Sequence, residues 1–236
     1  MIIYLISSTA VLFSVAYFIL IRWLLTQWKR RQPPKVSIIA PDTQVTVLVP
    51  ARNEAANIAS CLDSLLQQSY PQHLLEVIVI DDHSTDTTAT IVQSYAGKGV
   101  QLLSLADHLA TPTQAYKKAA ITLGVSAAKG SLILTTDADC IAPPGWVSQV
   151  VQAHVGEQWE CMAGPVLFHQ ERNALERFQS LDFIGTMMIT GAGISSRKLL
   201  LANGANFAFS IKSFVQVNGF EGVDEKASGD DVFLLL

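Results

Sequence analysis

Three short apolar segments, each running directly into charged residues, constrain the fold of this chain more than any other feature. They are Val45–Val49, Glu76–Ile80 and Leu132–Thr136. Their length and their content of Val, Ile and Leu are typical of strands buried inside a parallel sheet. Stretches with apolar residues at helical spacing separate them, so strands and helices alternate. This alternation predicts an α/β fold with a mostly parallel sheet flanked by helices.

The remaining elements follow from the same patterns. We expect helices around Ile58–Leu66, from Thr87 under an Asp86 cap, over Thr113–Ala128, after Trp146 and over Asn173–Ile189, and strands over Val100–Leu105, Cys161–Leu167 and Phe207–Phe209. Gly130 stands where a glycine commonly stops a helix. Gly191-Ala192-Gly193 predicts a flexible loop.

Polar residues follow each of the first three apolar segments, and we expect them on one edge of the sheet. They are Arg52 and Glu54, then Asp81 and Asp82, then Asp137 and Asp139. Ligands of open parallel sheets bind beyond the carboxyl ends of the strands. If the chain stays extended past Thr136, Asp137 and Asp139 face one side together and require a compensating cation. A divalent ion that also binds a substrate's phosphates supplies one, so the pattern predicts a site for a phosphate-bearing nucleotide.

Two pairs of adjacent charged residues have alternative interpretations. Asp82 can accept a hydrogen bond from a nucleobase N–H while Arg52 holds the base or ribose; alternatively, the pair Asp81-Asp82 only caps the next helix. Lys117 and Lys118 lie near the start of a predicted helix, where a cation opposes the helix dipole. One of them therefore meets a diphosphate, or both are solvated surface residues.

The N-terminal segment is long and apolar enough to cross a membrane. Ile2–Leu25 is interrupted only by small polar residues and Arg22, and Trp28, Lys29 and Arg30 follow it. We expect a transmembrane anchor over residues 1–28 and a basic, proline-containing linker over 29–44. The basic flank predicts that the following domain faces the cytoplasm; a buried core helix is the alternative. The net charge of -4 argues against a nucleic-acid partner.

Five motifs of the chain occur together in one known family. They are Pro50-Ala51-Arg52-Asn53-Glu54, the Asp81-Asp82-x-Ser84-x-Asp86 turn, Asp137-Ala138-Asp139, Asn203-Gly204-Ala205-Asn206-Phe207 with Asn218-Gly219-Phe220, and Gly229-Asp230-Asp231. Their order and spacing resemble those of family 2 glycosyltransferases of the GT-A (Rossmann-like) fold. The resemblance covers about residues 45–236, which we expect to form one GT-A domain.

The resemblance implies an inverting transfer of a sugar from a nucleoside diphosphate donor, commonly a UDP-sugar, with Mg²⁺ or Mn²⁺. It implies that Pro50, Arg52 and Glu54 border the nucleoside pocket, that Asp82 contacts the base and that Asp137 lies near the ribose and the donor. It also implies that Asp139 ligates the metal and that Asp231 is the catalytic base with Asp230 beside it. We expect Ala51 and Lys117 at the donor site as well. The expected acceptor is a lipid-linked or cell-envelope glycan, and the expected location is the cell membrane with the catalytic domain cytoplasmic.

The chain departs from the family pattern near its end. The late acidic pair is Asp-Asp where many members have Glu-Asp, so either Asp230 or Asp231 can be the base. No Gln-x-x-Arg-Trp motif follows within the sequence, and we expect a fragment cut short after the catalytic-base motif. A nucleotidyltransferase is one alternative, although such enzymes usually carry a Gly-rich, basic loop after the first strand. A non-catalytic nucleotide-sugar-binding protein is the other.

Overall fold

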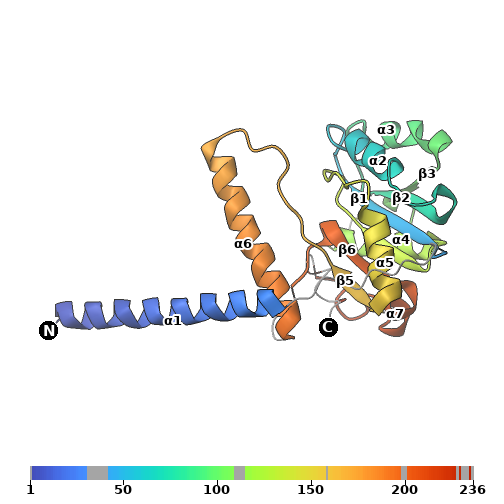
Figure 1. The fold of residues 1–236 in the computed structure, drawn as a ribbon. Coiled ribbons are helices and arrows are strands. Elements are labelled where there is room, and N and C mark those ends of the chain that lie inside the picture. The colour runs from blue at the N-terminus through green and yellow to red at the C-terminus, as the bar shows by residue number, and fades with distance from the viewer. Residues whose placement is uncertain are drawn as a thin grey trace. The chain divides into compact units, whose positions relative to one another are not determined.

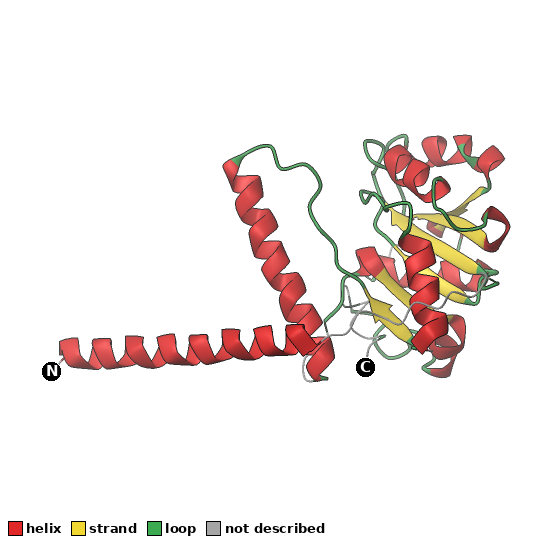
Figure 2. Ribbon diagram, viewed as in Figure 1, coloured by secondary structure: helices red, strands yellow, loops and turns green. Residues whose placement is uncertain are grey.

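The computed structural model describes residues 2–30, 42–108, 115–157, 159–197 and 201–226, together with Gly229 and Leu234. It divides into two compact units (Figure 1). The helical unit consists of residues 1–33 and 166–201, and the sheet unit consists of residues 34–165 and 202–236. In the described part of the chain, all strands lie in the sheet unit (Figure 2).

The sheet has six strands in the order β3-β2-β1-β4-β6-β5. The strands are β1 (Val45–Ala51), β2 (Leu75–Asp81), β3 (Val100–Ser104), β4 (Leu132–Thr135), β5 (Cys161–Ala163) and β6 (Phe207–Ser210). The first four are parallel to one another, whereas β6 runs antiparallel to both β4 and β5. The predicted α/β fold with a mostly parallel sheet is therefore confirmed, with β5 shorter than expected.

Helices cover both faces of this sheet. They are α2 (Ile58–Leu66), α3 (Thr88–Ser94), α4 (Tyr116–Ala127), α5 (Trp146–Glu157) and α7 (Ile211–Gln216), with short 3-10 turns η1 (Gln72–Leu74), η2 (Ala96–Lys98), η3 (Leu105–Asp107) and η4 (Gly204–Asn206). Val47 and Val49 pack on one face in a core shared with α2, α3 and α5. Leu48 points to the opposite face, in a core shared with α4 and α7. Alternate residues of a central strand thus enter two different cores.

Gly130 serves close packing rather than the end of a helix, so the expected glycine stop is wrong. α4 ends at Ala127, and Ala128 is already extended. A Cβ atom on Gly130 would lie 2.5 Å from the backbone nitrogen of Thr46. The Gly130 N–H donates to Thr46 Oγ1 at 3.0 Å. Only glycine allows this approach to β1, and it fixes where β4 enters the sheet.

The helical unit contains α1 (Ile2–Arg30) and α6 (Ala174–Ser196), which contact each other. Within the described residues, α1 is the one helix long and apolar enough to span a membrane, judged by length and composition alone. The expected flexible loop at Gly191-Ala192-Gly193 is wrong, because these residues continue α6 and are buried. Small side chains permit close packing of a helix, and here that packing outweighs the low helix propensity of glycine.

Candidate functional site

The loops after β1 and β2 are joined by hydrogen bonds into one structure. Ala51 pairs with Asp81, so the two strands end level with each other. The Asn53 N–H donates to Ser84 Oγ at 3.0 Å, and the Thr85 N–H donates to Asn53 Oδ1 at 2.8 Å. Asn53 adopts a φ of 55°, a left-handed conformation that asparagine tolerates well. These contacts hold Arg52 and Asp82 side by side at the carboxyl edge of the sheet.

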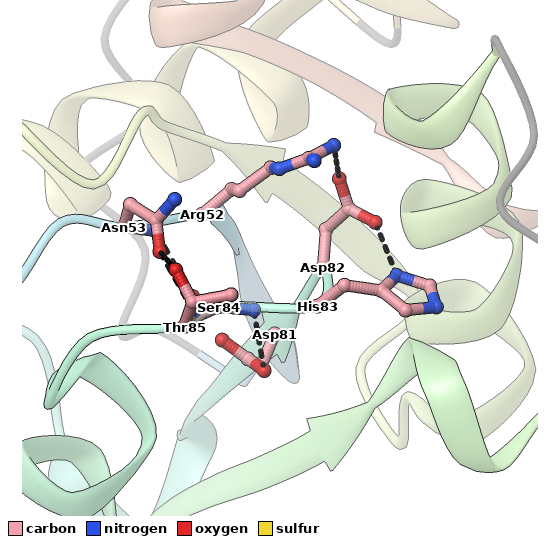
Figure 3. Close-up of polar contacts among 7 residues, drawn as sticks. All are labelled: Arg52, Asn53, Asp81, Asp82, His83, Ser84 and Thr85. Atoms are coloured by element: carbon pink, nitrogen blue, oxygen red, sulfur yellow. Dashed lines mark hydrogen bonds and ion pairs between the residues drawn. The ribbon is translucent and has the colours of Figure 1, made fainter.

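Asp82 uses both of its carboxylate oxygens within the protein (Figure 3). The side chain is almost fully buried. Oδ2 lies 3.3 Å from Arg52 Nη1, and Oδ1 lies 2.9 Å from His83 Nδ1. The Arg52 guanidinium in turn lies over the Tyr116 ring, 5.9 Å from its centroid. Asp82 therefore orients Arg52 and His83, and each of its oxygens already has a partner within the protein.

Asp81 differs from its neighbour because one of its oxygens lacks a partner. The residue is 8% exposed, and its Oδ2 accepts the Ser84 N–H at 3.3 Å. Oδ1 is buried and accepts no hydrogen bond from any described residue. A buried carboxylate oxygen without a donor is costly unless a ligand supplies one. The structure thus offers Asp81, where the sequence analysis favoured Asp82, as the acceptor for an N–H group.

The carboxylates after β4 lie on a turn, so they do not follow one extended strand. The Thr136 N–H still donates to Leu48 O at 3.2 Å, but the Cys140 N–H donates to Asp137 O at 3.1 Å and closes the turn. Asp137 Oδ1 forms an ion pair with Lys117 Nζ at 2.9 Å. Asp139 is exposed. The turn thus gives the two carboxylates different surroundings, one paired with a cation and one open to solvent.

Two cysteines lie close to this turn. Cys61 Sγ lies 3.7 Å from Asp137 O, and Cys140 Sγ lies 3.7 Å from Asp139 Oδ1. Burial raises the pKa of the Cys61 thiol to about 12, and the nearby carboxylates add to this effect. Burial likewise raises the pKa of the Cys140 thiol to about 11. Both groups are therefore neutral thiols at physiological pH.

The residues at this edge suit a magnesium or manganese ion that is shared with a substrate. The described residues contain no group of three or more His, Cys, Asp or Glu side chains able to hold a metal on their own. Mg²⁺ is usually held by one or two carboxylates together with substrate phosphates, and it keeps several waters. Asp139 is exposed next to the ion pair of Asp137, so its carboxylate is the one available to such an ion.

The adjacent lysines Lys117 and Lys118 have separate roles. Lys117 pairs with Asp137, at the site. Lys118 is 2% exposed, and its Nζ donates to Val223 O at 2.9 Å and to Lys226 O at 2.7 Å. The expectation of a solvated lysine pair is wrong for Lys118, because its ammonium group is satisfied inside the fold. Lys117 is therefore the one of the two lysines whose ammonium group lies beside the carboxylates after β4.

The other expected site residues fall into three groups. Pro50 and Ala51 belong to β1, and Ala51 is buried. Glu54 supports the start of α2, since its Oε2 accepts the Asn57 Nδ2–H at 2.9 Å and its carbonyl accepts the N–H of Ile58 at 2.9 Å. Asp230 and Asp231 lie outside the described residues.

Asn203 and Asn206, which belong to one of the five family motifs, are used by the fold. Asn203 Oδ1 accepts the Ala205 N–H at 3.0 Å. Asn206 Oδ1 accepts the Trp146 Nε1–H at 2.9 Å, while its Nδ2 donates to Pro165 O at 2.8 Å. These contacts fix the entry into β6 beside the end of β4.

Comparison with known proteins identifies the family. The sequence model of Glycosyl transferase family 2 matches residues 46–213. Glycosyltransferase AglE of Haloferax volcanii is 29% identical over 194 residues, covering 80% of this chain and 59% of that protein. The probable glycosyltransferase YdaM of Bacillus subtilis is 27% identical over 199 residues, covering 82% of this chain and 46% of that protein. This chain thus spans about half the length of these curated relatives.

Solved structures show the same fold. The mannosyltransferase PcManGT from Pyrobaculum calidifontis, in complex with GDP-Man and Mn²⁺, superposes with a TM-score of 0.65 at 24% identity, covering 92% of this chain and 60% of its own. Residues 1–349 of S. aureus TarS, in complex with UDP, superpose with a TM-score of 0.58 at 19% identity, covering 81% of this chain and 53% of their own. The family match covers most of the chain, so this chain belongs to glycosyl transferase family 2.

Proposed function

We propose that this chain carries the donor-binding and catalytic part of an inverting glycosyltransferase that uses a nucleoside diphosphate sugar and a divalent cation. The observation that carries the proposal is the gathering, at one sheet edge, of a buried carboxylate oxygen without a partner, an exposed carboxylate and a lysine. The buried oxygen suits the nucleobase, the exposed carboxylate suits a metal ion bound to the phosphates, and the lysine suits a phosphate oxygen. The complexes of PcManGT with GDP-Man and Mn²⁺ and of TarS with UDP support the same donor class.

Nucleoside recognition centres on Asp81 in this proposal. Its Oδ1 accepts a ring N–H of the base, which both uracil and guanine present. Asp82 then acts indirectly, because it holds Arg52 and His83 in place. Arg52, supported by Tyr116, lies against the base or ribose. A UDP-sugar is the first candidate donor, and a GDP-sugar is the second.

The diphosphate is bound by the end of β4 and the start of α4. Asp139 holds Mg²⁺ or Mn²⁺ on the phosphates, and the bound metal offsets the negative charge that develops on the leaving diphosphate. Lys117 transfers from its ion pair with Asp137 to a phosphate oxygen. Asp137 is then free to accept a hydrogen bond from the ribose or the sugar.

The transfer itself is a single displacement. An acceptor hydroxyl oxygen attacks the anomeric carbon, the bond from that carbon to the phosphate oxygen breaks, and the nucleoside diphosphate leaves with the electron pair. A carboxylate of Asp231, or of Asp230, takes the hydroxyl proton. Attack from the face opposite the leaving group inverts the anomeric configuration.

The proposed acceptor is a lipid-linked or cell-envelope glycan, and the proposed location is a membrane. α1 supports this location by its length and apolar composition. Lys29 and Arg30 at its end favour a cytoplasmic catalytic domain by the positive-inside rule. A lipid-linked acceptor is consistent with catalysis next to a bilayer.

Titration calorimetry on the full chain in lipid nanodiscs tests the donor site. UDP and GDP are titrated with and without Mn²⁺, into the native protein, an Asp139→Ala variant and an Asp42→Ala control, in which an exposed acid ahead of β1 is removed. We expect Mn²⁺-dependent binding that Asp139→Ala weakens by roughly 10- to 100-fold, the cost of losing a charged contact, and that the control retains. Nucleotide binding that is absent, or indifferent to Mn²⁺ and Asp139, would refute the donor assignment.

Catalysis is tested separately from binding. Asp231→Asn should retain donor binding and lose sugar transfer, and Asp230→Asn identifies which acid is the base. A protein that binds the donor tightly but is indifferent to both substitutions in a transfer or donor-hydrolysis assay is a nucleotide-sugar-binding protein rather than an enzyme.

A further inference from the structure

The surface of α6 carries a stripe of large apolar side chains that the fold leaves exposed. Leu175, Phe178 and Leu181 are 66%, 67% and 70% exposed. Residues three apart lie on the same side of a helix, so these three form one face. Leu167 and Phe168 on the preceding segment are also exposed, and Phe168 packs edge-on against Phe183 of α6 at 5.2 Å between ring centroids. We call Leu167, Phe168, Leu175, Phe178 and Leu181 the apolar stripe.

The first half of α6 covers a polar side chain while it leaves large apolar side chains exposed. Ser180 is 5% exposed, whereas its neighbour Leu181 is 70% exposed. The polar side chain is thus covered and the apolar one is not. A helix of a soluble domain turns its apolar face toward the core, and exposed apolar patches of this kind mark surfaces that meet a protein or a membrane.

The helical unit itself indicates which of these covers the stripe. α6 packs against α1, the candidate membrane span, within one compact unit. Figure 1 shows that α6 crosses α1 near the C-terminal end of α1 instead of running alongside it. That end carries Trp28, Lys29 and Arg30, residue types that lie at the boundary between lipid and water. A helix that crosses a span at its boundary end lies along the membrane surface.

The charge of this segment specifies how it would bind. Residues 167–186 contain two arginines against three carboxylates, so there is no basic face to attract anionic lipids. Membrane contact must therefore come from apolar burial at the boundary of headgroups and acyl chains. Such contact depends little on salt and does not require anionic lipids.

The topology connects α6 to the edge of the sheet that carries the site. The chain leaves the sheet after Ala163 of β5, forms α6, and returns at Phe207 of β6. Ala163 pairs with Phe207, and Phe207 pairs with Thr135 at the end of β4. Asp137 and Asp139 follow Thr135 directly. The segment between β5 and β6, which contains the apolar stripe, therefore leaves and re-enters the sheet next to the end of β4.

We propose that α6 is an in-plane membrane helix whose apolar stripe inserts among the lipids, at the level of the headgroups and upper acyl chains. This inference rests on the proposed membrane anchoring by α1. It adds a second membrane contact in the segment that joins β5 to β6.

Photo-crosslinking to lipid tests this inference on the full native chain. The protein is reconstituted into phosphatidylcholine liposomes that contain a phosphatidylcholine with a diazirine in its acyl chain, irradiated, digested with trypsin and mapped by mass spectrometry. Phe178 and Leu181 fall in one tryptic peptide, after Arg177. The chain provides its own references: α1 should be labelled, whereas Val215 and Val217, which are 64% and 57% exposed in the sheet unit, should not.

We expect label on α1 and on Phe178 and Leu181, at a yield several-fold above that on Val215 and Val217. The yield on Phe178 and Leu181 should be the same at 0.1 M and 1 M salt, where the Debye length is about 10 Å and 3 Å respectively. A Phe178→Ser, Leu181→Ser variant should lose the α6 label and keep the α1 label; a Phe178→Leu variant should keep both. Label on α1 without label on α6 overturns the inference, since α6 is then covered by protein. Absence of label from both α1 and α6 overturns the membrane anchoring as well. Label on Val215 equal to that on Phe178 and Leu181 indicates non-specific adsorption of the protein and also overturns the inference.

Discussion

The neighbouring residues Asp81 and Asp82 show how the end of a strand gives identical side chains different tasks. Asp81 is the last residue of β2 and keeps the pleat of the sheet, while Asp82 is the first residue beyond it. The carboxylate of Asp82 is therefore directed to Arg52 and His83, and that of Asp81 keeps one buried oxygen open. An open buried carboxylate of this kind is a common mark of a functional site.

Substitution of Asp81 by Asn should reduce nucleotide binding without reducing stability. The change removes a buried charge whose unsatisfied oxygen costs the fold roughly 1–3 kcal/mol, and it also removes the acceptor that we assign to the base. We expect a midpoint of thermal unfolding at or above that of the native chain, together with UDP or GDP affinity lowered by roughly tenfold or more. Circular dichroism and calorimetry measure the two quantities.

The matched control for that prediction is Asp82→Asn. This variant loses the ion pairs with Arg52 and His83, so its midpoint of unfolding should fall. If Asp81→Asn is the less stable variant and binds nucleotide normally, the assignments of the two residues are reversed.

Asp86 should make the stability of the sheet unit depend on pH. Hydrogen bonds from the Thr88 hydroxyl, and then from the Thr88 and Ala55 amides, hold the pKa of its carboxyl below the usual value. A lowered pKa in the folded state means that the stabilisation is present above the pKa of the unfolded chain, about 3.9, and is lost as the pH falls further. Asp86→Asn should therefore lower the unfolding midpoint more at pH 7 than at pH 3. An equal effect at both values would contradict this account.

At the scale of elements, the sequence was most informative where periodicity and composition agree. β1, β2 and β4 and the helices α2 and α5 were predictable because buried strands and amphipathic helices leave direct patterns. The predictions for Gly130 and the Gly191-Ala192-Gly193 segment were wrong, because the sequence alone does not distinguish a glycine that allows close packing from a glycine that forms a turn. Only the distances to Thr46 and the burial of α6 distinguish the two uses.

The candidate site was predictable to the level of strand ends but not of single atoms. The parallel order of β1, β2 and β4 brings Arg52, Asp81, Asp82 and Asp137 to one edge, as expected from strands that alternate with helices. Which of two adjacent carboxylates or lysines faces that edge depends on turns and on tertiary partners. For Lys118 the partners are carbonyls more than 100 residues away, a separation at which the sequence carries no local signal.

Lys118 should act as the link between α4 and the segment 220–226. Its ammonium group is the donor for two carbonyls of that segment, so Lys118→Met removes two hydrogen bonds from a charged donor, each worth roughly 1.5–3 kcal/mol. We expect lower stability and faster amide exchange over residues 220–226, partly restored in Lys118→Arg. Lys117→Met is the control: it should weaken nucleotide binding without altering exchange in that segment. Slower exchange at 220–226 in Lys118→Met would contradict the link.

At the scale of the whole molecule, the sheet unit contains the candidate donor site and the helical unit contains the candidate membrane contacts. Each unit has its own set of contacts. β1, β2 and β4 are covered on both faces within the sheet unit, with Val47, Leu48 and Val49 fully buried. Donor binding can therefore stabilise the sheet unit without changing the stability of the helical unit.

Nucleotide and Mn²⁺ should accordingly protect one unit alone. At a nucleotide concentration 100 times the dissociation constant, the bound state gains about 2.7 kcal/mol. Because the contacts of Arg52, Asp81 and Asp139 all lie in the sheet unit, amide exchange of the full chain in nanodiscs should slow after β1, β2 and β4 and stay unchanged in α1 and α6. In the Asp139→Ala variant, nucleotide and Mn²⁺ should not slow amide exchange after β1, β2 and β4. Equal protection of α6 would mean that the two units respond as one cooperative structure, and donor binding would then be coupled directly to the helix that we place at the lipid surface.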